Sequence, residues 1–278
     1  MNAQQVVDTI IAYSEIPFKL VETCDRYISG LPETEVTGVV TTFMATVDVI
    51  KKAAELGSNM IITHEPTYFT GQDMTDWLAD DPVYLAKKRL LEENGIVIWR
   101  YHDHMHMKNP DEIYEGLLKE LCWEKFRRSN GTEKSEDFTA FFNDYYDIPK
   151  TTLRALSEYF KEKLRIPVVR IIGDPDMECS RIGILVGAGS TGLGSEEMPM
   201  QVMRKNNIDV MVCGEIKEWT LCAYVNDAQM LGFKKALLII GHERSEEWGM
   251  KHLAQCLQPL MPELPVTFID AKEPFTYI

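Results

Sequence analysis

The sequence predicts an α/β fold made of two related, intertwined strand–helix–strand halves with internal pseudo-symmetry. Short, nearly continuous apolar runs recur along the 278 residues, as expected of strands that helices cover on both faces of a sheet. Helical segments separate these runs, and two stretches of the chain repeat the same order of elements. Gly57, Gly95 and Gly232 follow helical segments, where glycine readily adopts the left-handed conformation that ends a helix.

The first stretch starts after Thr37. It reads as an apolar run over 38–46, a helix over 47–57, a strand over 59–66, a helix over 81–95 and a strand over 96–104. The second stretch repeats this order at 182–190, 197–207, 209–216, 218–232 and 235–243. The strand ends that carry THE and CGE are 150 positions apart, whereas His102 and His242 are 140 positions apart. We infer a duplication in which an insertion near 71–80 accounts for the difference between the two offsets.

These stretches divide the chain into a first α/β half over 1–125 and a second over 150–278, joined by a linker or loop over 126–149. The polar, turn-rich sequence RRSNGTEKSED lies in the linker. Thr152 follows it and is expected to cap a helix with the sequence LRALSEYFKEKL.

Composition limits the partners that the chain can have. A formal charge of -14 argues against nucleic acid or an anionic membrane, although a bound metal would still attract an anionic substrate. No apolar run reaches the length of a membrane span, and the amphipathic start lacks the basic region of a signal peptide. The six cysteines show no CxxC spacing, which favours small buried thiols in a reducing, cytoplasmic compartment.

Residues that can bind a divalent metal are concentrated at the ends of the predicted strands. The first such segment is Thr63-His64-Glu65-Pro66. Neighbours on a strand point to opposite faces, but at a strand end the backbone turns, and Pro66 favours such a geometry for Glu65. Both side chains are therefore candidate ligands. The alternative is that His64 caps the next helix and Glu65 lies in solvent.

The second segment is YHDHMH, with three imidazoles within five residues. If the strand continues that far, alternation places His102, His104 and His106 on one side and Asp103 on the other. Spacing alone does not decide which of the three binds metal. The alternative is a polar surface loop that is rich in histidine.

The third segment is GHERSEEWGMKHLAQCL, in which a strand leads into a helix that starts near Arg244. His242 and Glu246 are four residues apart and converge if the helix begins early enough. The glutamates also suit the positive end of the helix dipole, which is the alternative reason for their position. His252, further along the helix, is interpreted as partly buried packing.

Imidazoles and carboxylates together suit Zn, Fe, Mn or Co as divalent ions. Five or more donors from three strand ends exceed the four ligands of one structural zinc. Since carboxylates can bridge two ions that activate a water molecule, the donor set predicts two divalent metal ions in a dinuclear centre.

These motifs resemble those of the dinuclear metal-centre hexameric proteins, which are similar to Ngg-one-interacting factor three and are labelled GTP cyclohydrolase I type 2-like. The family's THHP motif matches THEP here, its HTNLD motif matches HDHMH, and its GHxxxE element matches His242 with Glu246. Further matches are GDPD at 173–176, the small-residue loop at 187–190 and the CGE at the end of the strand over 209–216. The resemblance covers nearly the whole chain, in order.

Two family positions have exchanged donor types in this chain. Glu65 stands where the family has a histidine, and His106 stands where it has an aspartate. The resemblance therefore implies three histidines and two carboxylates as metal ligands, as in the family. The implied metal ligands are His64, Glu65, His106, His242 and Glu246.

The leading functional prediction is a metal-dependent hydrolase that acts on a small nucleotide-like or heterocyclic substrate. His102 and His104 are the candidate catalytic residues, because an imidazole can transfer protons near neutral pH. The alternative is a non-enzymatic metal-binding scaffold or regulatory interaction protein. The resemblance also implies a homohexamer, arranged as a trimer of dimers, with its metal sites facing an interior cavity.

Overall fold

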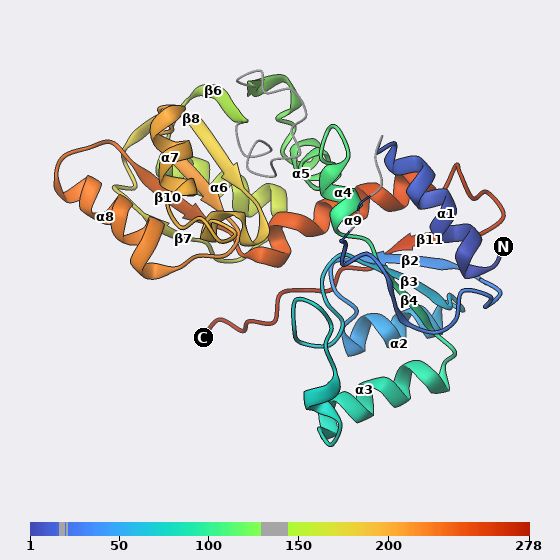
Figure 1. Cartoon of the computed structure of the whole chain (residues 1–278). Helices are drawn as coiled ribbons and strands as arrows, with labels where there is room; N and C mark the ends of the chain where they lie inside the picture. The colour runs from blue at the N-terminus through green and yellow to red at the C-terminus, as the bar shows by residue number, and fades with distance from the viewer. Residues whose placement is uncertain (17–19, 21, 129–143) are drawn as a thin grey trace. The chain divides into compact units, whose positions relative to one another are not determined.

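The computed structural model describes residues 1–16, 20, 22–128 and 144–278 (Figure 1). The chain forms two compact units, Met1–Gly116 with Glu247–Ala271 and Leu117–Glu246 with Lys272–Ile278. These limits differ from the predicted halves of 1–125 and 150–278. The physical reason is that β11 (Val266–Phe268), near the C-terminus, pairs with β2 (Val39–Thr42) of the first unit.

The first unit is built on a five-stranded sheet. Its strands are β1 (Tyr27–Ser29), β2, β3 (Met60–Thr63), β4 (Val97–Arg100) and β11, in the order β1-β4-β3-β2-β11. Every neighbouring pair is parallel except β1 with β4. Since β2, β3 and β4 are buried along their whole length, they form the continuous apolar runs expected from the sequence.

The helices of this unit include α1 (Ala3–Ser14), α2 (Val47–Glu55) and α3 (Pro82–Glu93), with a short 3₁₀ helix, η1, at Asp76–Leu78. Figure 1 shows α2 and α3 on one side of the sheet and α1 on the other. Thr46 caps α2, and Asp81 caps α3 ahead of a proline at its first position, so local capping sets both starts. Gly57 and Gly95 end these helices with positive φ angles, as predicted.

Three further helices carry residues of the candidate sites. These are α4 (Asp103–Met107), α5 (Glu112–Leu121) and α9 (His242–Leu257). The core of the first unit lies between β2, β3, β4 and helices α2 and α3, and it includes Val40, Ile50, Ile61, Leu91 and Ile98.

The second unit contains a six-stranded sheet. Its strands are β5 (Arg127–Arg128), β6 (Tyr145–Thr152), β7 (Arg170–Ile172), β8 (Glu178–Leu185), β9 (Val210–Cys213) and β10 (Ala236–Ile239), in the order β5-β6-β8-β9-β10-β7. The three strands β8, β9 and β10 are parallel, whereas β5, β6 and β7 pair antiparallel with their neighbours.

Helices α6 (Leu153–Leu164), α7 (Met198–Lys205) and α8 (Ala223–Met230) belong to the second unit, with short helical turns η2 (Glu124–Phe126), η4 (Gly187–Thr191) and η5 (Glu218–Cys222). Its core includes Met203, Met211, Leu221, Val225 and Leu237. The prediction that Thr152 caps the helix LRALSEYFKEKL is confirmed, because its side chain accepts a hydrogen bond from the N–H of Ala155.

The predicted linker over 126–149 lies partly outside the described residues, which leave out 129–143. On either side of that gap, β5 and β6 pair with each other, so the described flanks of this linker or loop include strand residues.

The α/β fold class is confirmed, and the two units share an order of elements. Both units contain three neighbouring parallel strands, with an antiparallel strand beside the third. In the first unit these are β2, β3 and β4 with β1, and in the second unit they are β8, β9 and β10 with β7. The predicted duplication agrees with this order. Within the described part of the chain, no helix is both long and apolar enough to cross a membrane.

Candidate metal centre

Two of the predicted site histidines lie just beyond the carboxyl ends of neighbouring parallel strands. His64 directly follows β3, and His102 comes two residues after β4. Hydrogen bonds from the backbone N–H groups of His64 (3.1 Å) and Glu65 (2.8 Å) to the carbonyl oxygen of Phe43 turn the chain at this point. Because the chain turns here, His64 and Glu65 no longer follow the alternation of a strand.

The segment after β4 is helical. The Asp25 carboxylate accepts the backbone N–H groups at 102, 103 and 104, at 2.7, 2.8 and 2.9 Å, and so satisfies the first donors of α4. The prediction that His102, His104 and His106 share one side is therefore wrong, because on a helix it is residues four apart that lie together. His102 and His106 lie on one side, and the Nδ1 atom of His104 is 2.7 Å from Asp25 Oδ2.

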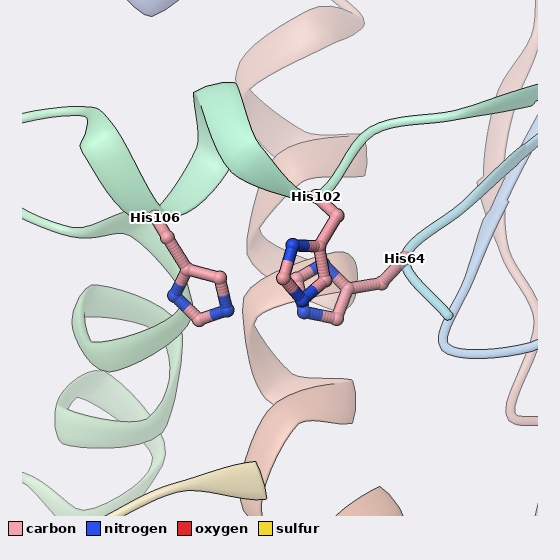
Figure 2. Close-up of side chains that lie close together, drawn as sticks. All are labelled: His64, His102 and His106. Atoms are coloured by element: carbon pink, nitrogen blue, oxygen red, sulfur yellow. The ribbon is translucent and has the colours of Figure 1, made fainter. Parts of the chain in front are cut away.

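His64, His102 and His106 form a cluster, which we call the histidine triad (Figure 2). The rings of His64 and His102 stack with their centroids 4.5 Å apart, and the ring of His106 lies edge-on at 5.0 and 4.8 Å from them. Each residue offers one ring nitrogen within 4.8 Å of the other two. His64 and His106 are buried, whereas the side chain of His102 is 24% exposed. The triad is therefore accessible to solvent on the side of His102.

In all three rings, an oxygen that can only accept lies beside Nδ1. It is the carbonyl of Tyr101 for His64 (3.2 Å) and the carboxylate of Asp103 for His102 (2.8 Å). For His106 it is the carboxylate of Asp111 (2.9 Å). In the neutral imidazole, Nδ1 therefore carries the proton and Nε2 keeps the lone pair. This is the usual arrangement of histidines that bind a metal through Nε2.

The two carboxylates beside the triad are themselves held in place. Asp111 is buried and also accepts the backbone N–H of Ile113, so it caps the start of α5. Burial works to raise the pKa of Asp103, but hydrogen bonds from the His102 ring and the N–H of Cys24 outweigh burial and hold that pKa well below its usual range. Asp103 therefore stays charged as an acceptor for His102.

Glu65 lies at the edge of the triad and is tied to Arg100. Its Oε2 is 3.5 Å from Nη2 of Arg100, and its Oε1 is 3.8 Å from Nε2 of His102. Arg100 is buried, and it also donates to the carbonyl oxygens of His64 (3.0 Å) and Gly71 (2.6 Å). This arginine thus links the turn that carries His64 to the carboxylate that was predicted as a ligand.

The second unit gathers the remaining predicted ligands at the corresponding strand ends. His242 begins α9, and its Nε2 lies 3.0 Å from Oε2 of Glu246, so the predicted convergence of these two residues is confirmed. On its other side, Nδ1 lies 2.8 Å from Oε1 of Glu215, which follows β9. Glu246 is buried, whereas about half of Glu215 is exposed.

A glycine-rich loop, the turn η4, closes tightly over this second group. Gly187 has φ +50°, and a Cβ there would lie 2.0 Å from Oε1 of Glu246. Its N–H donates to Oγ of Ser245 on α9 at 2.9 Å. A Cβ at Gly214 would lie 2.5 Å from the backbone of Gly187. Only glycines let the loop approach the glutamate so closely.

Several residues that position the site were not predicted from the sequence. Asp25 lies 77 residues before His102, so no local pattern connects them. Asp111 could have been found, because an aspartate directly before the helical sequence EIYEGLLKEL is a typical N-cap. Arg100 lies inside a buried strand, where sequence offers no signal beyond its unusual charge.

The donor set fits a divalent metal. Three imidazoles with Nε2 lone pairs suit Zn²⁺, Fe²⁺ or Co²⁺, and the nearby carboxylates broaden that range to Mn²⁺. An α/β protein with such a cluster at the carboxyl end of a parallel sheet belongs to the class of candidate metal-binding α/β proteins.

The particular family follows from comparison with known proteins. A model of the Duf34/NIF3 (NGG1p interacting factor 3) family matches residues 1–274, so the chain belongs to that family and the predicted resemblance is confirmed. A protein of Campylobacter jejuni named GTP cyclohydrolase 1 type 2 homolog is 23% identical over 269 residues, which cover 94% of each chain. A protein of the same name from Clostridium perfringens is 25% identical over 257 residues, covering 90% of this chain and 89% of its own.

Solved structures agree on the fold. The crystal structure of a hypothetical protein of Staphylococcus aureus matches with a TM-score of 0.74 at 23% identity, covering 100% of this chain and 99% of the other. A Bacillus cereus protein related to NIF3 matches with a TM-score of 0.72 at 15% identity and the same coverage. At these identities the likeness shows the fold alone.

Proposed function

We propose that this protein is a metal-dependent hydrolase that acts on a small nucleotide-like or heterocyclic substrate. The observation that supports it best is the histidine triad, in which three Nδ1 atoms face acceptor oxygens and each ring offers one nitrogen within 4.8 Å of the other two. The names of the relatives, GTP cyclohydrolase 1 type 2 homolog, point to the same kind of substrate. A divalent ion bound there would supply Lewis-acid activation of a water molecule.

The proposed ligands in the first unit are His64, His102 and His106, with Glu65 at their edge. This assignment moves His102 from the proton-transferring role that we expected to a ligand role, because its Nδ1 lies beside Asp103 and its ring stacks on that of His64. Arg100 would hold the Glu65 carboxylate in position. His104 would steady α4 through Asp25, a role that does not require contact with the substrate.

His242 and Glu246 remain proposed ligands of a second ion, as the family resemblance implies. For His242 to bind metal through Nε2, its Nδ1 must donate to Glu215, and the 2.8 Å contact suits that tautomer. Glu246 would then turn from a hydrogen-bond partner of His242 into a second ligand. Metal counts on variants of each unit test whether the centre is dinuclear.

The first experiment is elemental analysis of protein purified without added metal, followed by a hydrolysis screen with nucleotides and phosphoesters. We expect at least two divalent ions per chain, the number that a two-metal hydrolase needs, and turnover that disappears with the metal. His64→Ala and His242→Ala should each lower the metal content, whereas His104→Ala should leave it unchanged. Metal content that neither His64→Ala nor His242→Ala alters would contradict the proposal.

The second candidate function is a non-enzymatic metal-binding regulatory protein. The family description, NGG1p interacting factor 3, names an interaction and favours this alternative. A full complement of metal without turnover on any screened compound would support it over the hydrolase.

The proposed assembly is a homohexamer. Light scattering should then give six times the 31.9 kDa mass of the chain. A monomeric mass would contradict this part of the proposal without affecting the metal ligands.

A further inference from the structure

A second group of metal-binding side chains lies in the first unit, where α5 crosses α9. The two helices touch through glycine: a Cβ at Gly116 would lie 2.3 Å from the carbonyl oxygen of Trp248, and a Cβ at Gly249 would lie 2.6 Å from Cα of Ile113. No side chain separates the two backbones at this point. The close crossing brings Glu112, one turn before Gly116, beside the part of α9 that follows Gly249.

Two residues of α9 face Glu112 there. His252 and Cys256 are four residues apart, so they share one side of the helix. The Sγ atom of Cys256 lies 3.5 Å from Nε2 and 3.7 Å from Nδ1 of His252. Ligand atoms of Glu112, His252 and Cys256 all lie within 4.8 Å of one another.

Tyr13 of α1 fixes the carboxylate of this group. Its hydroxyl donates to Oε1 of Glu112 at 2.6 Å and also contacts the Cys256 thiol. Burial, together with the negative charge of Glu112, raises the pKa of Tyr13 well above its usual value. The phenol therefore keeps its proton and orients Glu112, which is itself buried.

One distance in this group matches the spacing of two ligands on a tetrahedral zinc ion. With Zn–S near 2.3 Å and Zn–N near 2.1 Å, a thiolate sulfur and an imidazole nitrogen on one zinc ion stand about 3.6 Å apart. The 3.5 Å between Sγ and Nε2 agrees with that separation, whereas the 3.7 Å between Sγ and Nδ1 requires the ring to turn when an ion binds. Cys256 and His252 are only partly buried, so an ion can reach them from solvent.

We propose that Glu112, His252 and Cys256 form a further divalent-metal site, selective for zinc-like ions, that joins α5 to α9. Thiolate, imidazole and carboxylate are the three ligand types that zinc uses in proteins, and the fourth position is open to water. Binding releases the thiol proton of Cys256 to solvent. The site is distinct from the histidine triad, although Asp111, the residue before Glu112, orients His106 of that triad. The assignment does not rest on the proposed hydrolase activity.

Cobalt substitution tests the site by a signal that the histidine triad cannot produce. Apo protein titrated with Co²⁺ should develop a near-ultraviolet thiolate-to-cobalt charge-transfer band, because this site includes a sulfur ligand. Cys256→Ser should abolish the band, and Glu112→Gln should weaken it. Cys24→Ser is the matched control, since Cys24 lies beside His102 and Asp103 and is the thiol that could give the same band elsewhere. Loss of the band in Cys24→Ser with retention in Cys256→Ser would overturn the proposal.

A measurement on the unmodified chain guards against variants that do not fold. Iodoacetamide labelling followed by mass spectrometry should be about tenfold slower at Cys256 when Zn²⁺ is present, because a metal-bound thiolate is a poor nucleophile. Cys122, which is exposed, serves as the internal control and should react at the same rate with and without the ion. Equal labelling of Cys256 in both conditions would also overturn the proposal.

Discussion

The two units place different chemistry on the same framework of strand ends. In the first unit, His64 follows the middle parallel strand, and His102 and His106 stand four residues apart after the next one. In the second unit, the corresponding positions hold Gly214, His242 and Glu246. Both units thus use a strand end followed by a pair of residues one helical turn apart.

The difference between His64 and Gly214 has a steric cause. In the second unit, the backbone of Gly187 occupies the space that a side chain at 214 would need. In the first unit, a side chain at the corresponding position is buried and forms part of a metal-type cluster. The position after the middle parallel strand therefore holds an imidazole in the first unit, whereas in the second unit the backbone of a glycine loop fills that space.

The surroundings of the rings differ as well. Each ring of the triad has its Nδ1 beside an acceptor oxygen, and the three rings lie against one another. His242 instead lies between two carboxylates, Glu215 and Glu246. The two units share an order of strands, and the residues at the strand ends decide whether each site offers mainly imidazole or mainly carboxylate.

The largest effect is expected from adding a side chain at Gly214, the glycine that corresponds to His64. Gly214→Ala should destabilise the protein by about 3 kcal/mol or more, because the added Cβ meets backbone that cannot move aside. Thermal unfolding followed by circular dichroism measures the change. Gly71→Ala, where a Cβ has open space, is the control and should stay within about 0.5 kcal/mol.

A smaller but specific effect is expected from histidine substitutions on α4. His106→Asn should weaken metal binding by at least about 100-fold, because it removes a ligand from the triad. His104→Asn should change affinity by less than about twofold, since His104 faces Asp25. Calorimetric titration of apo protein with Zn²⁺ distinguishes the two. Equal losses would favour the extended geometry that alternation predicts.

Replacing Asp111, the hydrogen-bond partner of His106, should lower metal affinity less than replacing His106 itself. Asp111→Asn should lower metal affinity by about 10- to 100-fold, because the amide orients the imidazole less strongly than the carboxylate does. The same titration measures the change, and Asp144→Asn, at an ion pair in the second unit, is a control that should leave the affinity unaltered. An unaltered affinity in Asp111→Asn would mean that His106 needs no orienting partner.

The last expected effect concerns the dependence of stability on pH. Burial lowers the pKa of Lys87 to about 8, against an unfolded value of about 10.4, while the charge of Asp73 acts in the opposite direction. The unfolded chain therefore binds more protons between those values, so this lysine makes stability rise with pH from about 8 to about 10.4. Relative to Lys87→Met, the wild type should gain about 2–3 kcal/mol over that window.

Unfolding temperatures at pH 7, 8, 9 and 10 provide the measurement. Lys88→Met, which alters the exposed neighbouring lysine, should follow the wild type at every pH. If the unfolding temperatures of the wild type and of Lys87→Met change with pH in the same way, the Lys87 ammonium is not desolvated.

The local elements were largely predictable because their causes are local. Thr46, Asp81 and Thr152 cap helices through their own side chains, and the buried strands are apolar along their whole length. The pairing of His242 with Glu246 was predictable for the same reason, since a helix brings residues four apart together. The YHDHMH segment was not, because Asp25, far away in sequence, supplies the cap that makes it helical.

The sequence by itself determined the fold class, the strand ends that carry the site, and the chemical types of the donors, because apolar periodicity, capping and residue identity act over a few positions. The tertiary structure alone decided which donors from distant segments meet. It turned His104 away from His102 and His106, placed Asp111 behind His106, and brought Glu112 of one helix beside His252 and Cys256 of another. These contacts depend on hydrogen bonds and glycine-mediated packing between distant segments, which spacing along the chain does not encode.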